Sequence, residues 1–333
     1  MAAQQQEAFG MDQPPTTSPP PQAPPQGRHT SAAEPGWLWE SVRYQFWRAA
    51  DLDRSIRHVG PFTPEQGEAI AYWWSLLAAV EGLGLRAYAA AFVGATERRD
   101  SDQVRWSLLA MLHDELQHEE LCRLALERFA PGWPRRYAPR TPLGRRANRH
   151  LDRVHQQAEC CWQHYQRGLT RHGLPVATGA LLLSELAAGA LYDRWADGCA
   201  IPALATALHH TASDARRHQA VLRALAARDW PSLAAPARAE AAVQVQATTG
   251  LLSVVLLDTA AGADLPADLA ASRRACQAAA CQAGLGVPTA EQRQELLRAA
   301  LLEVKDLQHR YDIPFPAMPG LAILGTEESA VDA

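Results

Sequence analysis

The chain has 333 residues, of which 47% are hydrophobic, and a formal net charge of -4 at pH 7. Such a composition is typical of one large or two ordinary globular domains with a sizeable buried core. Because the arginines are scattered and the charge is nearly balanced, the sequence carries no electrostatic footprint for nucleic acid, and we exclude that class of partner.

The beginning of the chain is dense in Pro, Gln, Ser and Ala, so residues 1–35 are predicted to form a disordered tail. They lack the basic start and apolar run of a signal peptide, and the six cysteines include no C-x-x-C pair, which favours a cytoplasmic chain with reduced thiols. Residues 36–312 are predicted to form one helical domain. Residues 313–333 are predicted to form an arm laid over it that ends in a loose tail.

Nearly every segment from Trp37 onward is predicted to be helical, because Pro and Gly separate long runs rich in Ala, Leu, Arg and Glu. Thr63, Thr141 and Thr289 stand where helix N-caps are expected. The predicted helices cover residues 37–58, 64–95, 101–129, 142–171, 175–196, 201–229, 236–257, 266–283 and 290–311. Several approach 30 residues, or about 45 Å in length, which suits an antiparallel bundle with short connections. The predicted fold class is therefore all-α.

The length of the apolar stretches bears on whether the protein binds a membrane. No apolar stretch is expected to reach the roughly 18 residues that a membrane helix needs. The best candidate, Val176 to Tyr192, is interrupted by Glu185. We therefore expect no membrane partner.

Two acids stand alone in apolar helices. Glu81 has no charged neighbour in AIAYWWSLLAAVEGLGL, and Glu185 has none in VATGALLLSELAAGALY. A buried carboxylate must be protonated, paired or bound to a metal, because leaving it charged and alone costs several kcal/mol. For either acid considered singly, pairing with an arginine or protonation is the more ordinary explanation.

Two further helices carry acids next to histidines. The segment MLHDELQHEE places Glu115 and His118 on one helix face, and HHTASDARRH carries Asp214 and His218. Along the chain, the order over four helices is Glu, Glu-x-x-His, Glu, and an acid with His, which is the ligand pattern of bundles that hold two irons or manganese ions. Carboxylates neutralise and bridge such cations, while neutral imidazoles supply terminal nitrogen ligands.

These motifs resemble the ferritin-like di-iron carboxylate proteins over roughly residues 64–229. With His210 one turn before Asp214, the chain looks most like the p-aminobenzoate N-oxygenase branch, which oxidises aryl amines to nitro compounds. The resemblance implies a ferritin-like bundle with a four-helix core and additional helices. It also implies a cofactor of two irons, with manganese as the alternative metal, and O2 as co-substrate.

The second motif departs from this pattern because Ala215 stands where a ligand Glu belongs. In one interpretation Asp214 only orients a histidine from outside the ligand shell, as Asp114 does. In the other, Asp214 is itself a ligand, because His210, Asp214 and His218 follow at four-residue steps about 40° apart on a helix. A π-bulge would then absorb the one extra residue between Asp214 and His218.

We favour the second interpretation. The predicted metal ligands are accordingly Glu81, Glu115, His118, Glu185, His210, Asp214 and His218, with Asp114 in the second shell.

The sequence therefore predicts an O2-dependent, non-haem di-iron oxygenase. N-oxygenation of an amine, of the aryl-amine type, in a biosynthetic pathway is the favoured reaction, and C–H hydroxylation, oxidative cleavage and desaturation are the alternatives. The predicted partners are a small-molecule substrate, an electron donor that the sequence does not identify, and a second copy of the chain in a homodimer. A protein of another class, a degenerate metal-binding or scaffold bundle with an incomplete site, stays open because of Ala215.

Overall fold

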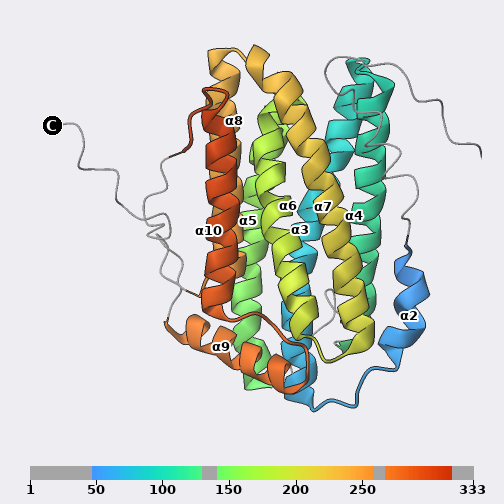
Figure 1. Ribbon diagram of the computed structural model, residues 1–333. Coiled ribbons are helices and arrows are strands. Elements are labelled where there is room, and N and C mark those ends of the chain that lie inside the picture. The colour runs from blue at the N-terminus through green and yellow to red at the C-terminus, as the bar shows by residue number, and fades with distance from the viewer. Residues whose placement is uncertain (1–46, 130–140, 259–266, 317–333) are drawn as a thin grey trace, which may run out of the picture. The chain divides into compact units, whose positions relative to one another are not determined.

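The computed structural model describes residues 47–129, 141–258 and 267–316, and within these ranges the regular structure is entirely helical (Figure 1). The helices are α2 (Ala49–Arg57), α3 (Pro64–Glu97), α4 (Asp102–Phe129), α5 (Pro142–His172), α6 (Leu174–Gly198), α7 (Pro202–Asp229), the short 3-10 helix η1 (Trp230–Ser232), α8 (Ala235–Leu256), α9 (Ala267–Gln282) and α10 (Ala290–His309). The all-α prediction is confirmed.

The helix boundaries follow local signals in the sequence. From the second predicted helix onward, each observed helix begins and ends within two residues of its prediction. Thr63 and Thr289 each accept a hydrogen bond from the backbone N–H three residues later, in a capping box with a Gln at that position, and Thr141 caps α5. Of the predicted helix at 37–58, residues 37–46 lie outside the described chain, and within the described part the helix begins only at Ala49.

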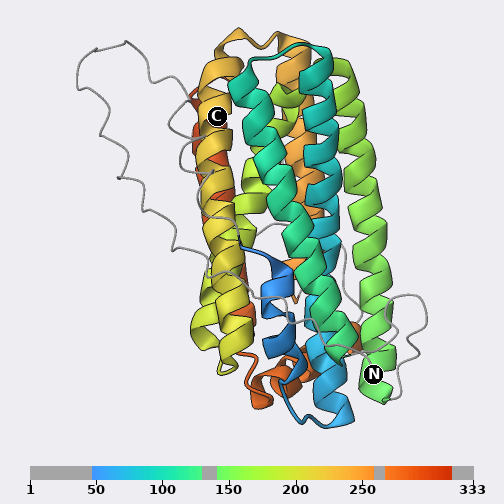
Figure 2. The same cartoon turned by 90° about the vertical axis from the view of Figure 1, so that its right-hand side faces the viewer.

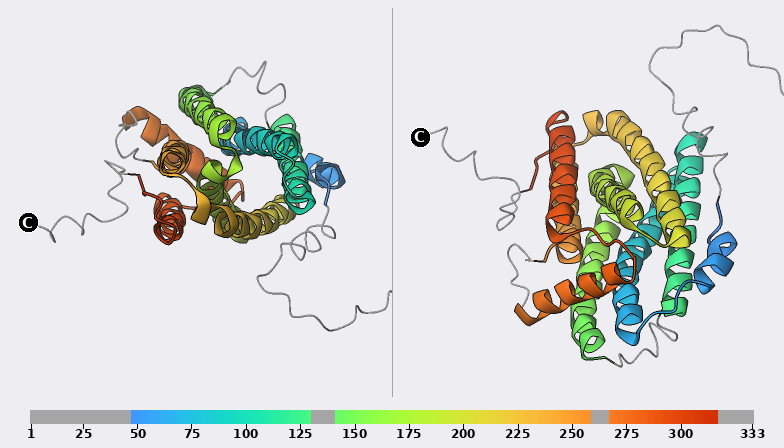
Figure 3. Two further views of the ribbon diagram at one scale, coloured as in Figure 1. Left: turned by 90° about the horizontal axis from the view of Figure 1, so that it is seen from above. Right: turned by 60° about the horizontal axis from the view of Figure 1, so that its bottom comes forward.

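Two antiparallel helix pairs form the centre of the bundle. α3 packs along α4, and α6 packs along α7, whereas α4 meets α7 and α3 meets α6 at only a few positions. α5 and α8 flank these pairs and pack against each other, and α10 packs on α6. Figure 2 shows the long helices running side by side, and Figure 3 shows α9 lying across one end. The looser contact between the two pairs leaves an interior layer that polar side chains occupy.

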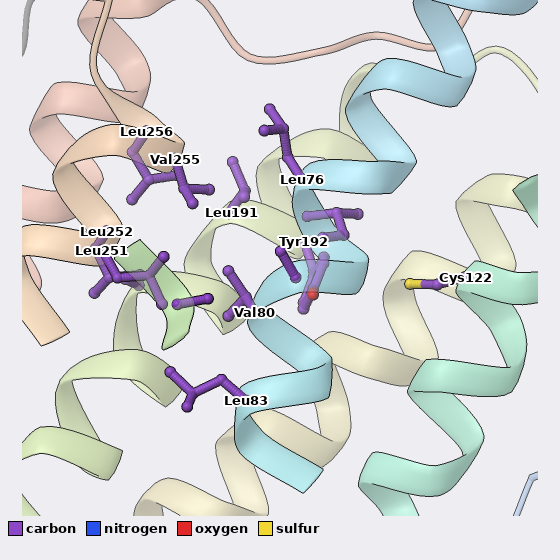
Figure 4. Packing of buried hydrophobic residues seen from close by; sticks show 14 of the residues in the cluster. Leu76, Val80, Leu83, Cys122, Leu191, Tyr192, Leu251, Leu252, Val255 and Leu256 are labelled. Atoms are coloured by element: carbon purple, nitrogen blue, oxygen red, sulfur yellow. The ribbon is translucent and has the colours of Figure 1, made fainter. Parts of the chain in front are cut away.

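The apolar core joins these layers. Val80 and Leu83 of α3, Leu191 of α6 and Leu251 and Leu252 of α8 belong to one cluster of buried side chains (Figure 4). Burying a side chain of this kind stabilises the fold by about 1.5–3 kcal/mol. The core therefore extends from the central pairs to the flanking helices as one packed body, which fixes the backbone positions from which the polar layer projects.

The structure corrects the expectation that no stretch is long and apolar enough for a membrane. Within the described ranges, α3, α6 and α8 each contain an 18-residue window whose length and composition would allow it to cross a membrane, with mean hydropathies of 1.5, 1.6 and 1.2. The isolated acids do not lower the hydropathy of such a window enough to exclude it. In α6, 78% of the window is buried inside the protein, because α6 packs against other helices on several sides.

His150 of α5 is buried among neutral and cationic groups. Its Nδ1 lies 2.9 Å from the Tyr72 hydroxyl, and its Nε2 lies 3.1 Å from the carbonyl oxygen of Val254. Burial, together with the positive charge of Arg273, lowers the pKa of His150 to about 3. The imidazole is therefore neutral in the folded protein at every ordinary pH.

The low pKa of His150 predicts that the stability of the fold depends on pH. The unfolded chain takes up a proton on His150 near pH 6.5, while the folded protein does so only near pH 3, so the free energy of unfolding falls as pH drops through that window. The slope from this one group is at most about 1.4 kcal/mol per pH unit. Urea denaturation of the wild type and of His150→Gln between pH 7 and 4 measures it. Equal pH dependence in the two proteins would contradict the prediction.

Candidate metal centre

The acidic and imidazole side chains of four helices meet between the two central helix pairs. Glu81 comes from α3, Glu115 and His118 from α4, Glu185 from α6, and His218 from α7. Each is less than one-tenth exposed. The sequence-based expectation that Glu81 and Glu185 are buried is therefore confirmed, and the structure brings all five side chains together.

The first group of candidate ligands is Glu81, Glu115 and His118. One potential ligand atom from each lies within 4.8 Å of the other two. The Nδ1 atom of His118 is 3.1 Å from Oε2 of Glu81 and 3.7 Å from Oε1 of Glu115. Two carboxylates and an imidazole nitrogen at this spacing form a compact set of donors for a divalent transition metal.

The second group has the same composition, two glutamates and a histidine, and takes Glu185 and His218 from the α6–α7 pair. Glu115, Glu185 and His218 also offer ligand atoms within 4.8 Å of one another. The Nδ1 atom of His218 is 3.1 Å from Oε1 of Glu185 and 3.5 Å from Oε1 of Glu115. Glu115 belongs to both groups, and its Oε1 atom lies between the two imidazoles. A shared carboxylate is the arrangement by which two cations are bridged.

Each aspartate next to these groups accepts a hydrogen bond from a histidine on the other helix. Nε2 of His118 on α4 lies 3.0 Å from Oδ2 of Asp214 on α7, while Nε2 of His218 on α7 lies 3.2 Å from Oδ2 of Asp114 on α4. With metals bound, a proton on Nε2 that each imidazole donates to its aspartate would leave Nδ1 as the nitrogen that faces the glutamates. Arg217 donates to both aspartates and so ties the two crossed pairs together.

The structure places Asp214 and His210 outside both groups of ligand atoms, although the sequence interpretation that we favoured made them ligands. The Oδ2 atom of Asp214 accepts hydrogen bonds from His118 and, at 2.7 Å, from Nε1 of Trp47. The ring of His210 stacks on Trp47 with centroids 5.3 Å apart. α7 is a regular α-helix throughout, without the π-bulge that was expected to absorb the extra residue between Asp214 and His218.

Two tyrosines donate hydrogen bonds to the glutamates that belong to only one group each, Glu81 and Glu185. The hydroxyl of Tyr88 on α3 donates to Oε1 of Glu185 on α6 at 2.6 Å, and the hydroxyl of Tyr192 on α6 donates to Glu81 on α3. Each tyrosine stands seven residues after one glutamate and bonds the other. Helical spacing alone does not reveal which partner helix each hydroxyl reaches.

The electrostatics of the cluster favour bound positive charge. Burial and the neighbouring Glu81 raise the pKa of Glu115 well above its usual value. Burial acts to lower the pKa of His218, but Glu185 and Asp114 outweigh it and raise the value to about 10. Without metal, protons on these side chains therefore offset the concentrated negative charge.

The charge of the cluster fits two divalent cations. When ionised, the glutamates at 81, 115 and 185 and the aspartates at 114 and 214 carry five negative charges, and Arg217 cancels one. Two divalent ions would neutralise the remaining four while both imidazoles stay neutral, which is the form in which histidine binds metals. The oxygen and nitrogen donors are those that iron and manganese accept in proteins.

Gly84 provides the space that Glu115 occupies. A Cβ atom on Gly84 would lie 2.6 Å from Oε2 of Glu115, whereas one on Gly82 would meet no atom within 4 Å. We expect Gly84→Ala to displace the shared carboxylate and to weaken metal binding at least tenfold. Gly82→Ala is the matched control; it should leave metal binding unchanged and stabilise the helix by about 1 kcal/mol. Equilibrium titration with Mn2+ compares the two, and equal affinities would contradict the assignment.

Comparison with solved structures supports the fold. A variant of an R2-like ligand-binding oxidase with an aerobically reconstituted Mn/Fe cofactor matches 81% of this chain and 91% of its own, with a TM-score of 0.55 and 14% sequence identity. Another variant of such an oxidase, with an Fe/Fe cofactor, matches 84% of this chain and 85% of its own at 13% identity and a TM-score of 0.40. No model of a known protein family and no curated protein matches the sequence. The protein is thus an all-α, ferritin-like helical bundle.

Proposed function

We propose that the protein is an O2-dependent oxidoreductase that binds two metal ions, two irons or a manganese and an iron. The observation that carries this proposal is the pair of buried ligand groups that share Glu115. The solved structures of similar fold are oxidases with Mn/Fe or Fe/Fe cofactors that were reconstituted aerobically. When bound, two such redox-active metals supply the electrons that reduce O2 and the oxidising power that acts on a substrate.

The side chains of the centre would bind the metals, orient the imidazoles and exclude water. Glu81 and His118 would hold one metal, Glu185 and His218 the other, and Glu115 both. Asp114 and Asp214 would fix the orientation and the proton position of the imidazoles, as acids that accept a hydrogen bond from a metal-binding histidine do. The burial of all these groups excludes bulk water from the centre, which strengthens their attraction for the cations.

The role assigned to Asp214 predicts a graded effect. Asp214→Asn keeps the size of the side chain but weakens its hold on the His118 Nε2–H group, so we expect metal affinity to fall by about 10–100-fold with two metals still bound at saturation. Metal analysis of protein saturated with Mn2+ gives the stoichiometry. Loss of one metal even at saturation would instead make Asp214 a ligand.

For the reaction itself, we propose N-oxygenation of a small aryl amine, on the strength of the sequence resemblance. Hydroxylation of a C–H bond is the alternative that the same centre would support. Both need the same two metals and O2, so the difference lies in which atom of the substrate is presented to the centre. Product analysis with an aryl amine that also carries an oxidisable C–H bond distinguishes the two reactions.

One experiment tests the proposed function as a whole. Anaerobic titration with Fe2+ should load about two ions per chain, and mixing with O2 should then produce a transient visible absorption and consume O2. If the protein bound no iron, it would be a scaffold bundle. This is the alternative hypothesis that follows from Ala215 standing in place of a ligand glutamate. Binding of two ions without any reaction with O2 would exclude the oxidase and leave a metal-binding protein.

A further inference from the structure

A groove lies between the C-terminal halves of α3 and α5, and none of the candidate metal ligands lines it. Its volume is about 790 Å³. The apolar part of its lining consists of Ala89, Ala90, Val93, Trp162 and Leu169. Val93 is 53% exposed, so this apolar surface is open to solvent. Clefts that bind ligands have volumes of about 300–1,000 Å³, and the groove is therefore large enough to hold a short stretch of polypeptide.

The same groove carries positive charge. Its lining contains one acid and four basic side chains, namely Glu97 and Arg86, Arg98, Arg171 and His172. Arg86 lies 3.0 Å from Glu159, and Arg98 lies 3.0 Å from Asp100. Because ion pairs at such exposed positions are weak and a guanidinium has five N–H donors, these arginines keep donors for a further acid. Arg171 is exposed. The groove thus suits a ligand that is apolar in one part and acidic in another.

The last described residues of the chain lie close to one end of this groove. Ile313 packs in a buried cluster with Val176 of α6 and with Trp230. Nε1 of Trp230 donates to the carbonyl oxygen of Pro175 at 2.9 Å. Gly173, which lines the groove, precedes Val176 by only about one helical turn. The chain beyond residue 316 therefore continues from a point close to the groove.

Residues 317–333, which lie outside the described residues, have a composition that complements the groove. Their sequence, AMPGLAILGTEESAVDA, has an apolar run at 321–324, the acids Glu327, Glu328 and Asp332, and no Lys, Arg or His. An extended chain covers up to about 3.3–3.6 Å per residue, so the stretch from residue 316 to Glu327 spans up to about 35–40 Å. The helix from Arg86 to Arg98 is only about 18 Å long. The segment is therefore long enough to reach every part of the groove.

We propose that residues 317–333 bind in the groove between α3 and α5 of their own chain. The apolar run at 321–324 covers Val93 and Trp162, and the acids pair with the arginines of the groove. Burial of apolar surface drives the contact, while the opposite charges direct the segment to this face. Since the segment is tethered close by, its effective concentration is high and modest contacts suffice. The proposal concerns a surface outside the metal centre and goes beyond the proposed function.

A photocrosslinker on the floor of the groove tests this contact in the full chain. Val93→p-benzoylphenylalanine places the reactive group at a position that is already exposed, so the fold is expected to tolerate it. Val243→p-benzoylphenylalanine is the matched control, because Val243 is 37% exposed on α8 and does not line the groove. Circular dichroism establishes that both proteins are helical. After irradiation and digestion, mass spectrometry is expected to find residues 317–333 joined to position 93 and not to position 243.

The role of charge is tested in the protein that carries the crosslinker at position 93. Glu327→Gln combined with Glu328→Gln is expected to lower the crosslinking yield by roughly two- to fivefold, the effect of losing exposed charge pairs. Glu291→Gln combined with Glu295→Gln removes the same charge from exposed positions of α10 and should leave the yield unchanged. Equal yields from the two double variants would overturn the pairing of acids with the groove.

The products distinguish the possible occupants of the groove. The proposal is overturned if residues 317–333 are not joined to position 93, or if they are joined equally to position 243. A crosslink that produces a covalent dimer on a denaturing gel would place the segment of a second copy in the groove, which overturns binding within one chain. Because none of these measurements uses a metal, they leave the proposed function to be decided by the iron titration.

Discussion

Replacing Glu115 with glutamine is expected to remove both metal ions from the protein. Its carboxylate belongs to both groups of ligand atoms, and its Oε1 atom lies 3.7 Å from Nδ1 of His118 and 3.5 Å from Nδ1 of His218. Glutamine keeps the shape of the side chain but removes the negative charge that two cations would share. We therefore expect the metal content after loading and desalting to fall from about two ions per chain to nearly none, a loss far larger than that from changing an aspartate that only orients a histidine.

A neighbouring acid provides the control for this prediction. Glu119 stands on the same helix but is exposed, so Glu119→Gln changes the net charge equally and leaves the centre intact. Metal analysis of the two variants and the wild type, each loaded anaerobically with Fe2+, gives the comparison. Retention of two ions by Glu115→Gln would contradict the idea that one carboxylate bridges both positions. Retention of one ion would mean that Glu115 serves a single metal.

The second large effect is expected from Arg293→Met, at a buried position outside the metal centre. Arg293 of α10 is fully buried and donates to the carbonyl oxygens of Leu256 and Pro288, at 2.8 and 2.5 Å, and to the carboxylate of Asp258 at 2.5 Å. Its guanidinium also lies 5.0 Å from the centre of the Trp73 ring. Methionine has a comparable length but no donor, so these acceptors lose a buried partner.

We expect this substitution to reduce the free energy of unfolding by about 3–5 kcal/mol, the usual cost of removing one member of a buried ion pair. Arg273 still lies 3.0 Å from Asp258 and keeps the loss toward the lower end of that range. Urea denaturation at pH 7 measures the change. Arg298→Met, at an exposed position of the same helix, should change stability by about 0.5 kcal/mol or less. Equal effects of the two substitutions would contradict the structural role of Arg293.

Local features of the sequence were enough to predict the secondary structure. The Thr63 and Thr289 capping boxes and the Pro and Gly breaks act over a few residues, so helix boundaries could be placed within two residues from Pro64 onward. The apolar surroundings of Glu81 and Glu185 likewise predicted that these acids are buried. A charged group with no local partner must find one elsewhere in the fold, which made the acids recognisable as site residues.

The detailed roles of the polar residues required the tertiary structure. On α7, residues 210, 214 and 218 lie within a narrow sector of the helix, so sequence spacing could not distinguish a ligand from a residue one layer further out. In the folded protein, Asp214 contacts Nε2 of His118 and Nε1 of Trp47, and these contacts follow from how the helices pack and not from the spacing along α7. The same packing created the crossed pair of Asp114 with His218 and the Arg217 link between the two.

By itself, then, the sequence determined which helices form and that the isolated acids Glu81 and Glu185 are buried, because each of these depends on the order of neighbouring residues along one helix. The tertiary structure alone decided that Glu115 is shared, that Tyr88 and Tyr192 bond the glutamates of opposite helices, and that a groove remains between α3 and α5. These features depend on the distance and rotation between helices, which are set by the packing of the whole core and not by any single segment.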